Sequence, residues 1–187
     1  YVHAMKAEKG LWQGEWDVWR VDALVEKTFK VRLLGDLSLR LMGGVADTEA
    51  PMAFLYNMRG TYSRRFPVAS TNVFETMRPN EFLADRYVAF HLKHSFGKLL
   101  FESKHFSPRP AIVSSVAFGD MAHPEHHAGL SFTPLRQGYF ESGLLIENIL
   151  RSGFTSLGVG GFYRYGPNAL PDAKDNFAVK LTAGFAF

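Results

Sequence analysis

The chain has 187 residues, of which 47% are hydrophobic and 14% aromatic, and its mean hydropathy is near zero. One domain is expected at this length, and no stretch approaches the ~18 consecutive apolar residues of a membrane-spanning helix. The net charge is +3, but lysines and arginines are scattered between carboxylates, so the basic patch of a nucleic-acid partner surface is absent from the sequence. The chain contains no cysteine, which excludes disulfides and thiolate chemistry.

Apolar and polar residues alternate in seven segments, and this period of two predicts strands between an apolar and a polar environment. The first segment, 15–31, ends in a tight turn at Leu33-Leu34-Gly35. The remaining six follow in chain order at residues 36–41, 86–96, 110–121, 139–150, 157–166 and 176–187. The chain is therefore predicted to be all-β.

The segment 139–150 is the least regular of the seven. Glu147 falls on the same face as Leu145, which interrupts the separation of apolar and polar residues. A short helix is the alternative interpretation of this segment.

The last predicted strand, 176–187, alternates from end to end. Its length is that of a tilted strand crossing a bilayer, roughly 9–11 residues. Seventeen Phe and seven Tyr suit a lipid-facing band with aromatic girdles. The alternation assigns Val88, Phe90, Leu92, Val179, Leu181 and Phe185 to the lipid face, and His91, Lys93, Lys180 and Thr182 to the lumen. The sequence thus favours a transmembrane antiparallel β-barrel, and a soluble β-sandwich binding module is the alternative.

The connections between the predicted strands differ in length. Outer-membrane barrels alternate short periplasmic turns with longer external loops. With a periplasmic C-terminus, the long connections 46–84, 122–138 and 166–175 all fall outside the cell, and the turns 32–35 and 151–155 fall in the periplasm. The connection 97–108 is longer than this rule prefers.

Seven strands cannot close an antiparallel barrel, because the first and last strands pair antiparallel only when the number is even. Either residues 1–12 supply an eighth strand, or the chain is part of a larger barrel. The absence of a signal peptide at Tyr1 agrees with a start that lies upstream.

The final six residues resemble the C-terminal sorting signal of bacterial outer-membrane barrels. The signal has the order polar, any, Gly, aromatic, any, aromatic, which Thr182, Gly184, Phe185 and Phe187 match. The resemblance implies a bacterial outer-membrane location with the C-terminus in the periplasm. It also implies recognition of the C-terminal strand by the barrel-assembly machinery.

From about residue 16 onward the chain resembles the C-terminal part of an outer-membrane barrel family typical of Bacteroidota, whose members carry an N-terminal carboxypeptidase-regulatory-like domain. The matching stretches are Phe82-Leu-Ala-Asp-Arg-Tyr-Val-Ala-Phe90, Tyr139-Phe-Glu-Ser-Gly-Leu-Leu-Ile-Glu-Asn148, Gly158-Val-Gly-Gly-Phe-Tyr-Arg-Tyr-Gly-Pro167 and Asp175-Asn-Phe-Ala-Val-Lys180. The layout is also similar to the last strands of the BamA superfamily of assembly and translocation barrels, which have sixteen strands. The resemblance implies that 1–187 is the C-terminal part of one barrel domain in the outer-membrane bilayer. The other strands would come from upstream in the chain or from a neighbouring subunit.

In the BamA superfamily one long external loop carries an Arg-Gly-aromatic motif and folds back into the lumen. The corresponding loop here, 46–84, contains Arg59, Gly60 and Tyr62, with Thr61 between the glycine and the aromatic. The acidic partner of the superfamily maps onto Asp120. The resemblance implies an Arg59–Asp120 pair that holds the loop, and a solvated loop arginine is the alternative.

Little in the sequence points to catalysis. The one metal-like cluster, His123-Pro-Glu-His126-His127, lies in a predicted external loop, and a solvated loop without a metal is expected there. Gly158-Val-Gly160-Gly161 leads into strand residues rather than a helix, so it is not a phosphate loop. No Gly-x-Ser-x-Gly elbow occurs. We therefore expect no enzyme and no cofactor. A role in outer-membrane protein assembly or translocation follows from the resemblance, and a non-transporting scaffold or docking subunit of an outer-membrane complex is the alternative.

Overall fold

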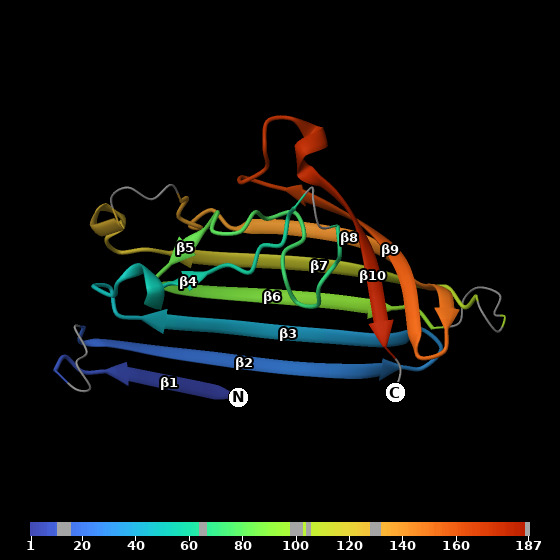
Figure 1. The fold of residues 1–187 in the computed structure, drawn as a ribbon, viewed down its shortest axis with the longest axis horizontal. Helices are drawn as coiled ribbons and strands as arrows, with labels where there is room; N and C mark the ends of the chain where they lie inside the picture. The colour runs from blue at the N-terminus through green and yellow to red at the C-terminus, as the bar shows by residue number, and fades with distance from the viewer. Residues whose placement is uncertain (11–15, 64–66, 98–102, 104–105, 128–131, 186–187) are drawn as a thin grey trace.

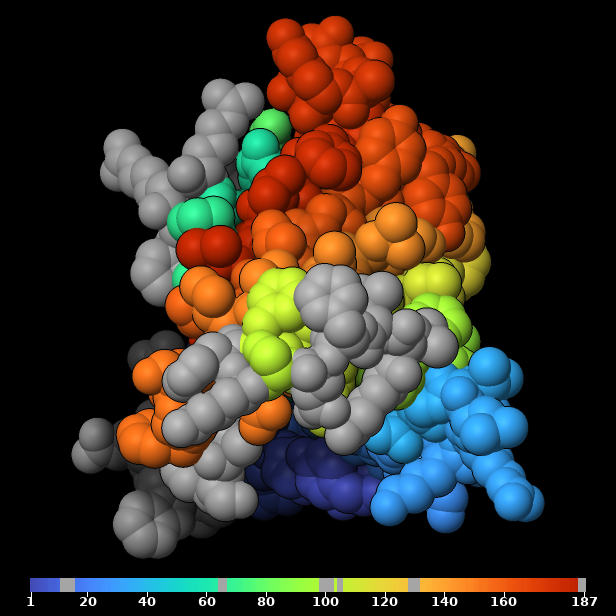
Figure 2. All heavy atoms as spheres, turned by 90° about the vertical axis from the view of Figure 1, so that its right-hand side faces the viewer, coloured from blue at the N-terminus to red at the C-terminus, as the bar shows by residue number. Residues whose placement is uncertain are grey.

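The computed structural model describes residues 1–10, 16–63, 67–97, 103, 106–127 and 132–185, and these are all-β (Figure 1). The main element is an eight-stranded sheet in the order β1-β2-β3-β6-β7-β8-β9-β10, in which every neighbouring pair is antiparallel. Its strands are β1 (Val2–Ala7), β2 (Val18–Val31), β3 (Gly35–Ala46), β6 (Arg86–Ser95), β7 (Arg109–Asp120), β8 (Tyr139–Ser152), β9 (Thr155–Tyr165) and β10 (Phe177–Phe185). Figure 2 views the sheet from the end that carries the β2–β3 and β8–β9 turns.

Short elements complete the fold. A second sheet pairs β4 (Tyr56–Asn57) with β5 (Leu83–Ala84). In the described residues, single turns of 3-10 helix lie at η2 (Met52–Phe54), η3 (Pro124–His127) and η4 (Ala173–Asn176). No helix in the described part of the chain is long and apolar enough to span a membrane.

The seven predicted strands are all present, and the count of seven is corrected to eight. The additional strand is β1, which lies within 1–12 and pairs with β2 from Val2↔Ala23 to Ala7↔Val18. Even with eight strands the sheet is not closed, because β1 and β10 are its two edges. An even number is necessary for closure but is not sufficient.

The irregular segment 139–150 is a strand and not a helix. Its pairing with β9 shifts register between Ile146 and Leu150, and Asn148 has a φ of 57°. The step of four residues on β8 against two on β9 is a β-bulge that adds two residues to β8, so Ile146 and Leu150 both stay on the exposed outer face. Leu145 and Glu147 both point to the inner face, where Leu145 is buried and Glu147 binds Lys93.

The two faces of the sheet differ in polarity in the way that the alternation predicts. The outer face is apolar and exposed, and its residues include Val21, Val25, Phe29, Leu41, Val45, Val88, Ile112, Phe118, Leu144, Ile146, Leu157, Tyr163, Phe177, Val179 and Leu181. The inner face carries a polar row across four adjacent strands, formed by the paired residues His91, Ser115, Glu141 and Arg164. All four members of this row are buried. The predicted inward positions of His91 and Lys180 are confirmed.

The inner face is covered by the long connection between β3 and β6, which we call the interior loop (residues 47–85). It runs across the sheet toward β10 (Figure 1). Its apolar side chains form one core cluster with residues of the sheet, comprising Met42, Ala46, Tyr56, Met58, Phe74, Met77, Phe82, Ala84, Ala89, Ala117, Leu135 and Tyr139. The core of the protein therefore lies between the sheet and its own loop.

Candidate functional site: the interior loop and its polar anchors

The predicted Arg-Gly motif lies in the middle of the interior loop, beside residues 74–78. Gly60 forms a parallel bridge with Phe74, and the backbone N–H of Tyr62 donates to the carbonyl of Met77 at 2.8 Å. A Cβ on Gly60 would lie 2.6 Å from the carbonyl oxygens of Met77 and Arg78. Glycine is required here because the two segments approach too closely for a side chain.

A buried ion pair joins the interior loop to the last strand. Lys180 of β10 is 1% exposed and Glu75 of the loop is 2% exposed, and Nζ lies 3.4 Å from Oε2. Lys180 also donates to the carbonyl of Thr61 at 2.8 Å. Glu75 accepts from the Thr61 hydroxyl at 2.8 Å and from the backbone N–H of Ser70 at 2.6 Å. The carboxylate is thus satisfied by several donors, as a buried charge requires.

A second anchor joins the loop to β8. The carboxylate of Glu141 accepts from the backbone N–H groups of Glu75 at 2.9 Å and Thr76 at 2.6 Å. The hydroxyl of Thr76 donates to the same carboxylate and lies 2.7 Å from the hydroxyl of Tyr139. One strand carboxylate therefore binds two successive backbone donors of the loop and fixes its path over the sheet.

A third anchor joins the loop to β9. Arg164 is 3% exposed, and its Nη1 lies 2.8 Å from Oε1 of Glu81. Its guanidinium packs 4.8 Å from the ring centre of Tyr139 and 5.7 Å from that of Phe82. The ion pair and the cation–π contacts hold the returning end of the loop.

The loop also pairs with the free edge of β10. The backbone N–H of Leu181 donates to the carbonyl of Pro67 at 2.6 Å, and the N–H of Ala69 donates to the carbonyl of Leu181 at 2.7 Å. Val68 and Leu181 thereby form a parallel bridge. Residues 67–69 of the loop thus pair with the backbone of Leu181, on the edge of β10 that faces away from β9.

The structure does not bring Arg59 and Asp120 together. Asp120 ends β7 and binds Arg86 at 2.7 Å together with Arg136. Arg59 lines a different cavity, together with His91 of β6. The interior loop does fold over the inner face, but the three anchors described above involve Glu75, Thr76 and Glu81 and not Arg59. The motif resemblance predicted that this loop folds over the inner face, but it did not predict the contacts of Glu75, Thr76 and Glu81. The sequence contains no pattern that indicates which loop residue contacts which strand.

The C-terminal signal residues lie in or beyond β10. Thr182 faces inward and packs on Gly158 of β9, and the carbonyl of Gly184 accepts from the Ser156 hydroxyl at 3.3 Å. Phe185 is the last residue of the strand. Phe187 lies outside the described residues.

Described residues of the loop and the sheet line two cavities between them. The larger, of about 610 Å³, is lined by residues of β1, β2, β3, β6 and the loop, including Arg59 and Tyr56. The smaller, of about 290 Å³, lies near Glu75 and Thr182. Burial, followed by the charge of Asp22, raises the pKa of Tyr56 to about 12, so its hydroxyl stays protonated and donates to the carbonyl of Val21 at 2.9 Å.

No family model matches the chain, and the comparisons with curated proteins and with solved structures find no match either.

Proposed function

We propose that the chain is the C-terminal part of a transmembrane β-barrel in a bacterial outer membrane, and that this barrel assembles or translocates other proteins. The observation that carries the proposal is the inverted polarity of the sheet. On β10, the outward Val179 and Leu181 are 57% and 55% exposed, and the inward Lys180 between them is 1% exposed. An apolar outer band around a polar interior is the organisation of outer-membrane barrels.

A soluble β-sandwich fits these exposures poorly. The exposed apolar side chains extend over seven neighbouring strands, from Val21 on β2 to Leu181 on β10. Contiguous apolar patches of this extent are rare on soluble monomers, because their contact with water is unfavourable. A hydrocarbon environment removes that cost.

The interior loop argues against a role as an open pore through which small molecules diffuse. Three polar anchors and an apolar cluster hold it over the inner face, so it occupies part of the space beside the sheet. The loop touches the edge of β10 at Leu181 alone among the described residues. A sheet edge can accept an added strand through its main-chain groups, which is the chemistry that a barrel needs to receive a client strand.

The scaffold role is the second candidate, and the same anchors favour it. A loop fixed by one buried and one partly buried ion pair is suited to a static plug. A static barrel can serve as a docking subunit without moving any client. The two candidates differ in how many other proteins depend on the barrel.

Depletion of the full-length protein in its native bacterium distinguishes them. For an assembly or translocation barrel, quantitative proteomics of outer membranes should show a decline of many unrelated barrels. For a scaffold, the loss should be confined to proteins that co-purify with it. A membrane proteome that does not change after depletion would contradict both roles.

A further inference from the structure

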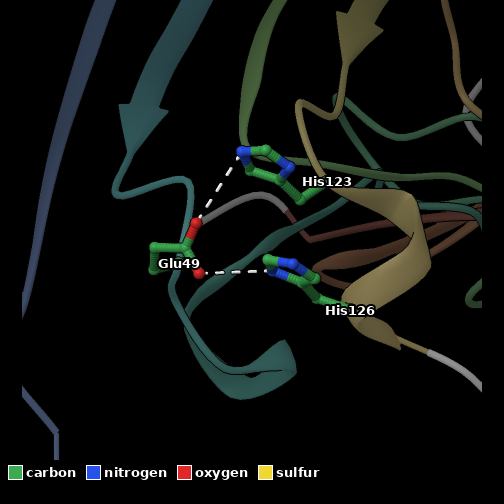
Figure 3. Close-up of side chains that lie close together, drawn as sticks. All are labelled: Glu49, His123 and His126. Atoms are coloured by element: carbon green, nitrogen blue, oxygen red, sulfur yellow. Dashed lines mark ion pairs between the residues drawn. The ribbon is translucent and has the colours of Figure 1, made fainter.

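Three side chains from two separate connections converge at the end of the sheet where β3 and β7 finish (Figure 3). Glu49 follows β3, and His123 and His126 follow β7. Oε1 of Glu49 lies 3.7 Å from Nε2 of His123, and Oε2 of Glu49 lies 3.2 Å from Nδ1 of His126. The three donor atoms all lie within 4.8 Å of one another. We propose that Glu49, His123 and His126 bind a divalent transition-metal ion of the zinc class.

The distances suit such an ion. Zinc takes imidazole nitrogens and carboxylate oxygens at about 2.0–2.2 Å in a tetrahedron, which places the donors about 3.4 Å apart. The two measured separations lie on either side of that value. Since no two of the three donor atoms are more than 4.8 Å apart, binding requires any pair to approach by at most about 1.4 Å. Rotation of the side chains can supply this movement.

Glu125 supplies an outer carboxylate for the site. Nδ1 of His123 lies 3.1 Å from Oε1 of Glu125, and an ionised carboxylate can only accept a hydrogen bond. Nδ1 therefore carries the proton, and in the neutral ring Nε2 presents its lone pair toward Glu49. This carboxylate–histidine arrangement orients histidine ligands in many zinc sites.

The backbone around each ligand is held by local hydrogen bonds. The N–H of Glu49 donates to Oδ1 of Asp47 at 3.0 Å, and the N–H of Asp47 donates to the carbonyl of Trp19. In η3, the N–H of His126 donates to the carbonyl of His123 at 3.2 Å. The ring centres of His123 and His126 are 4.8 Å apart and nearly parallel. Both connections thus present their ligands before any ion arrives.

The chemistry of the donors sets the class of ion. Two imidazoles favour zinc, cobalt, nickel or copper over magnesium and calcium, which prefer oxygen ligands alone. The ligand side chains are 41% to 64% exposed, so an ion can enter from solution and water can supply the fourth ligand. The bound ion would join the start of the interior loop to the β7–β8 connection.

The test is titration of the purified full-length protein with Zn²⁺, and with Co²⁺ as a spectroscopic probe. We expect one ion per chain and a cobalt absorption spectrum typical of tetrahedral coordination. His126→Ala and Glu49→Gln should abolish this binding. Glu125→Gln should weaken it by about 10- to 100-fold, as expected for an outer carboxylate.

His127→Ala is the matched control in the same turn. The ring of His127 packs edge-on toward Phe132, with 6.4 Å between ring centres, and it is not one of the three converging side chains. The variant should bind Zn²⁺ as the wild type does. The proposal is overturned if His126→Ala binds as tightly as the wild type, or if His127→Ala loses binding to the same extent. Circular dichroism of each variant shows that a lost signal does not come from unfolding.

Discussion

At the scale of single residues, the polar side chains of the inner face hold the interior loop. Alternation along β10 placed Lys180 inward, and the structure confirms this position with a side chain that is almost completely buried. Its partner Glu75 could not be predicted, because a loop without periodicity gives no indication of which strand it crosses. The same limit explains the wrong expectation for Arg59 and Asp120, since a motif match does not fix side-chain partners.

The Glu75–Lys180 pair should be strongly coupled. Removing one member of a buried pair leaves an uncompensated charge, so Lys180→Met should cost about 3–5 kcal/mol in the free energy of unfolding. The combined Glu75→Leu, Lys180→Met variant should cost clearly less than the sum of the two single changes. The measurement is a double-mutant cycle by denaturant unfolding in detergent or lipid. Lys174→Met, at an exposed position in η4, is the control and should change stability little.

A second cycle on Arg59→Ala and Asp120→Ala should give additive costs. These residues line different cavities, and Asp120 keeps Arg86 and Arg136 as partners whichever residue stands at position 59. Substitutions at residues without shared partners usually have additive effects on the free energy of unfolding, within roughly 0.3–0.5 kcal/mol. An interaction energy well above that amount would show that Arg59 and Asp120 interact, as the sequence motif implied.

At the scale of elements, period-two alternation was sufficient to find the strands of the sheet except β1. It succeeds because successive side chains of a strand must face opposite environments. It was least clear at β8, because the inner face of that strand carries both the buried Leu145 and Glu147, which binds Lys93. It could not find β4 and β5, because strands of two residues are too short to show any period.

The register of β10 predicts a sharp contrast between adjacent positions. Leu181→Arg places a charge on the outer face and should cost roughly 2–4 kcal/mol if it lies near the bilayer midplane. Thr182→Arg places the same side chain toward the inner face and should cost much less. Folding into lipid bilayers at increasing urea concentrations measures both. Equal costs would contradict the assignment of the faces, because a one-residue slip inverts the whole strand.

At the scale of the whole molecule, the order of the strands follows the chain, and the short and long connections predicted that antiparallel order. Closure could not be predicted from the connections, because it depends on whether the two edges meet. In the structure they do not, and β1 and β10 remain at opposite ends of the sheet. The barrel proposed above requires additional strands between these edges.

The isolated 187-residue chain should therefore not form a stable closed barrel. Unpaired backbone groups at a sheet edge each cost several kcal/mol in hydrocarbon. We expect aggregation when these residues are expressed alone, and a monodisperse protein when the additional strands of the proposed barrel are included. The measurement is size-exclusion chromatography in detergent combined with a heat-modifiability assay on gels. A monodisperse, heat-modifiable monomer made from these residues alone would contradict the prediction.

The anchors of the interior loop also constrain the order in which the protein can fold. Thr61 is bound by a lysine 119 residues later in the chain, and Thr76 by a glutamate 65 residues later. Contacts between neighbouring strands close short loops and form early, whereas such distant contacts form only after much more of the chain is ordered. The loop emerges first during synthesis but reaches its final position only after β10 has joined the sheet. Its docking is therefore a late event, and protection of residues 67–83 from protease during refolding would report that the C-terminal strand is in place.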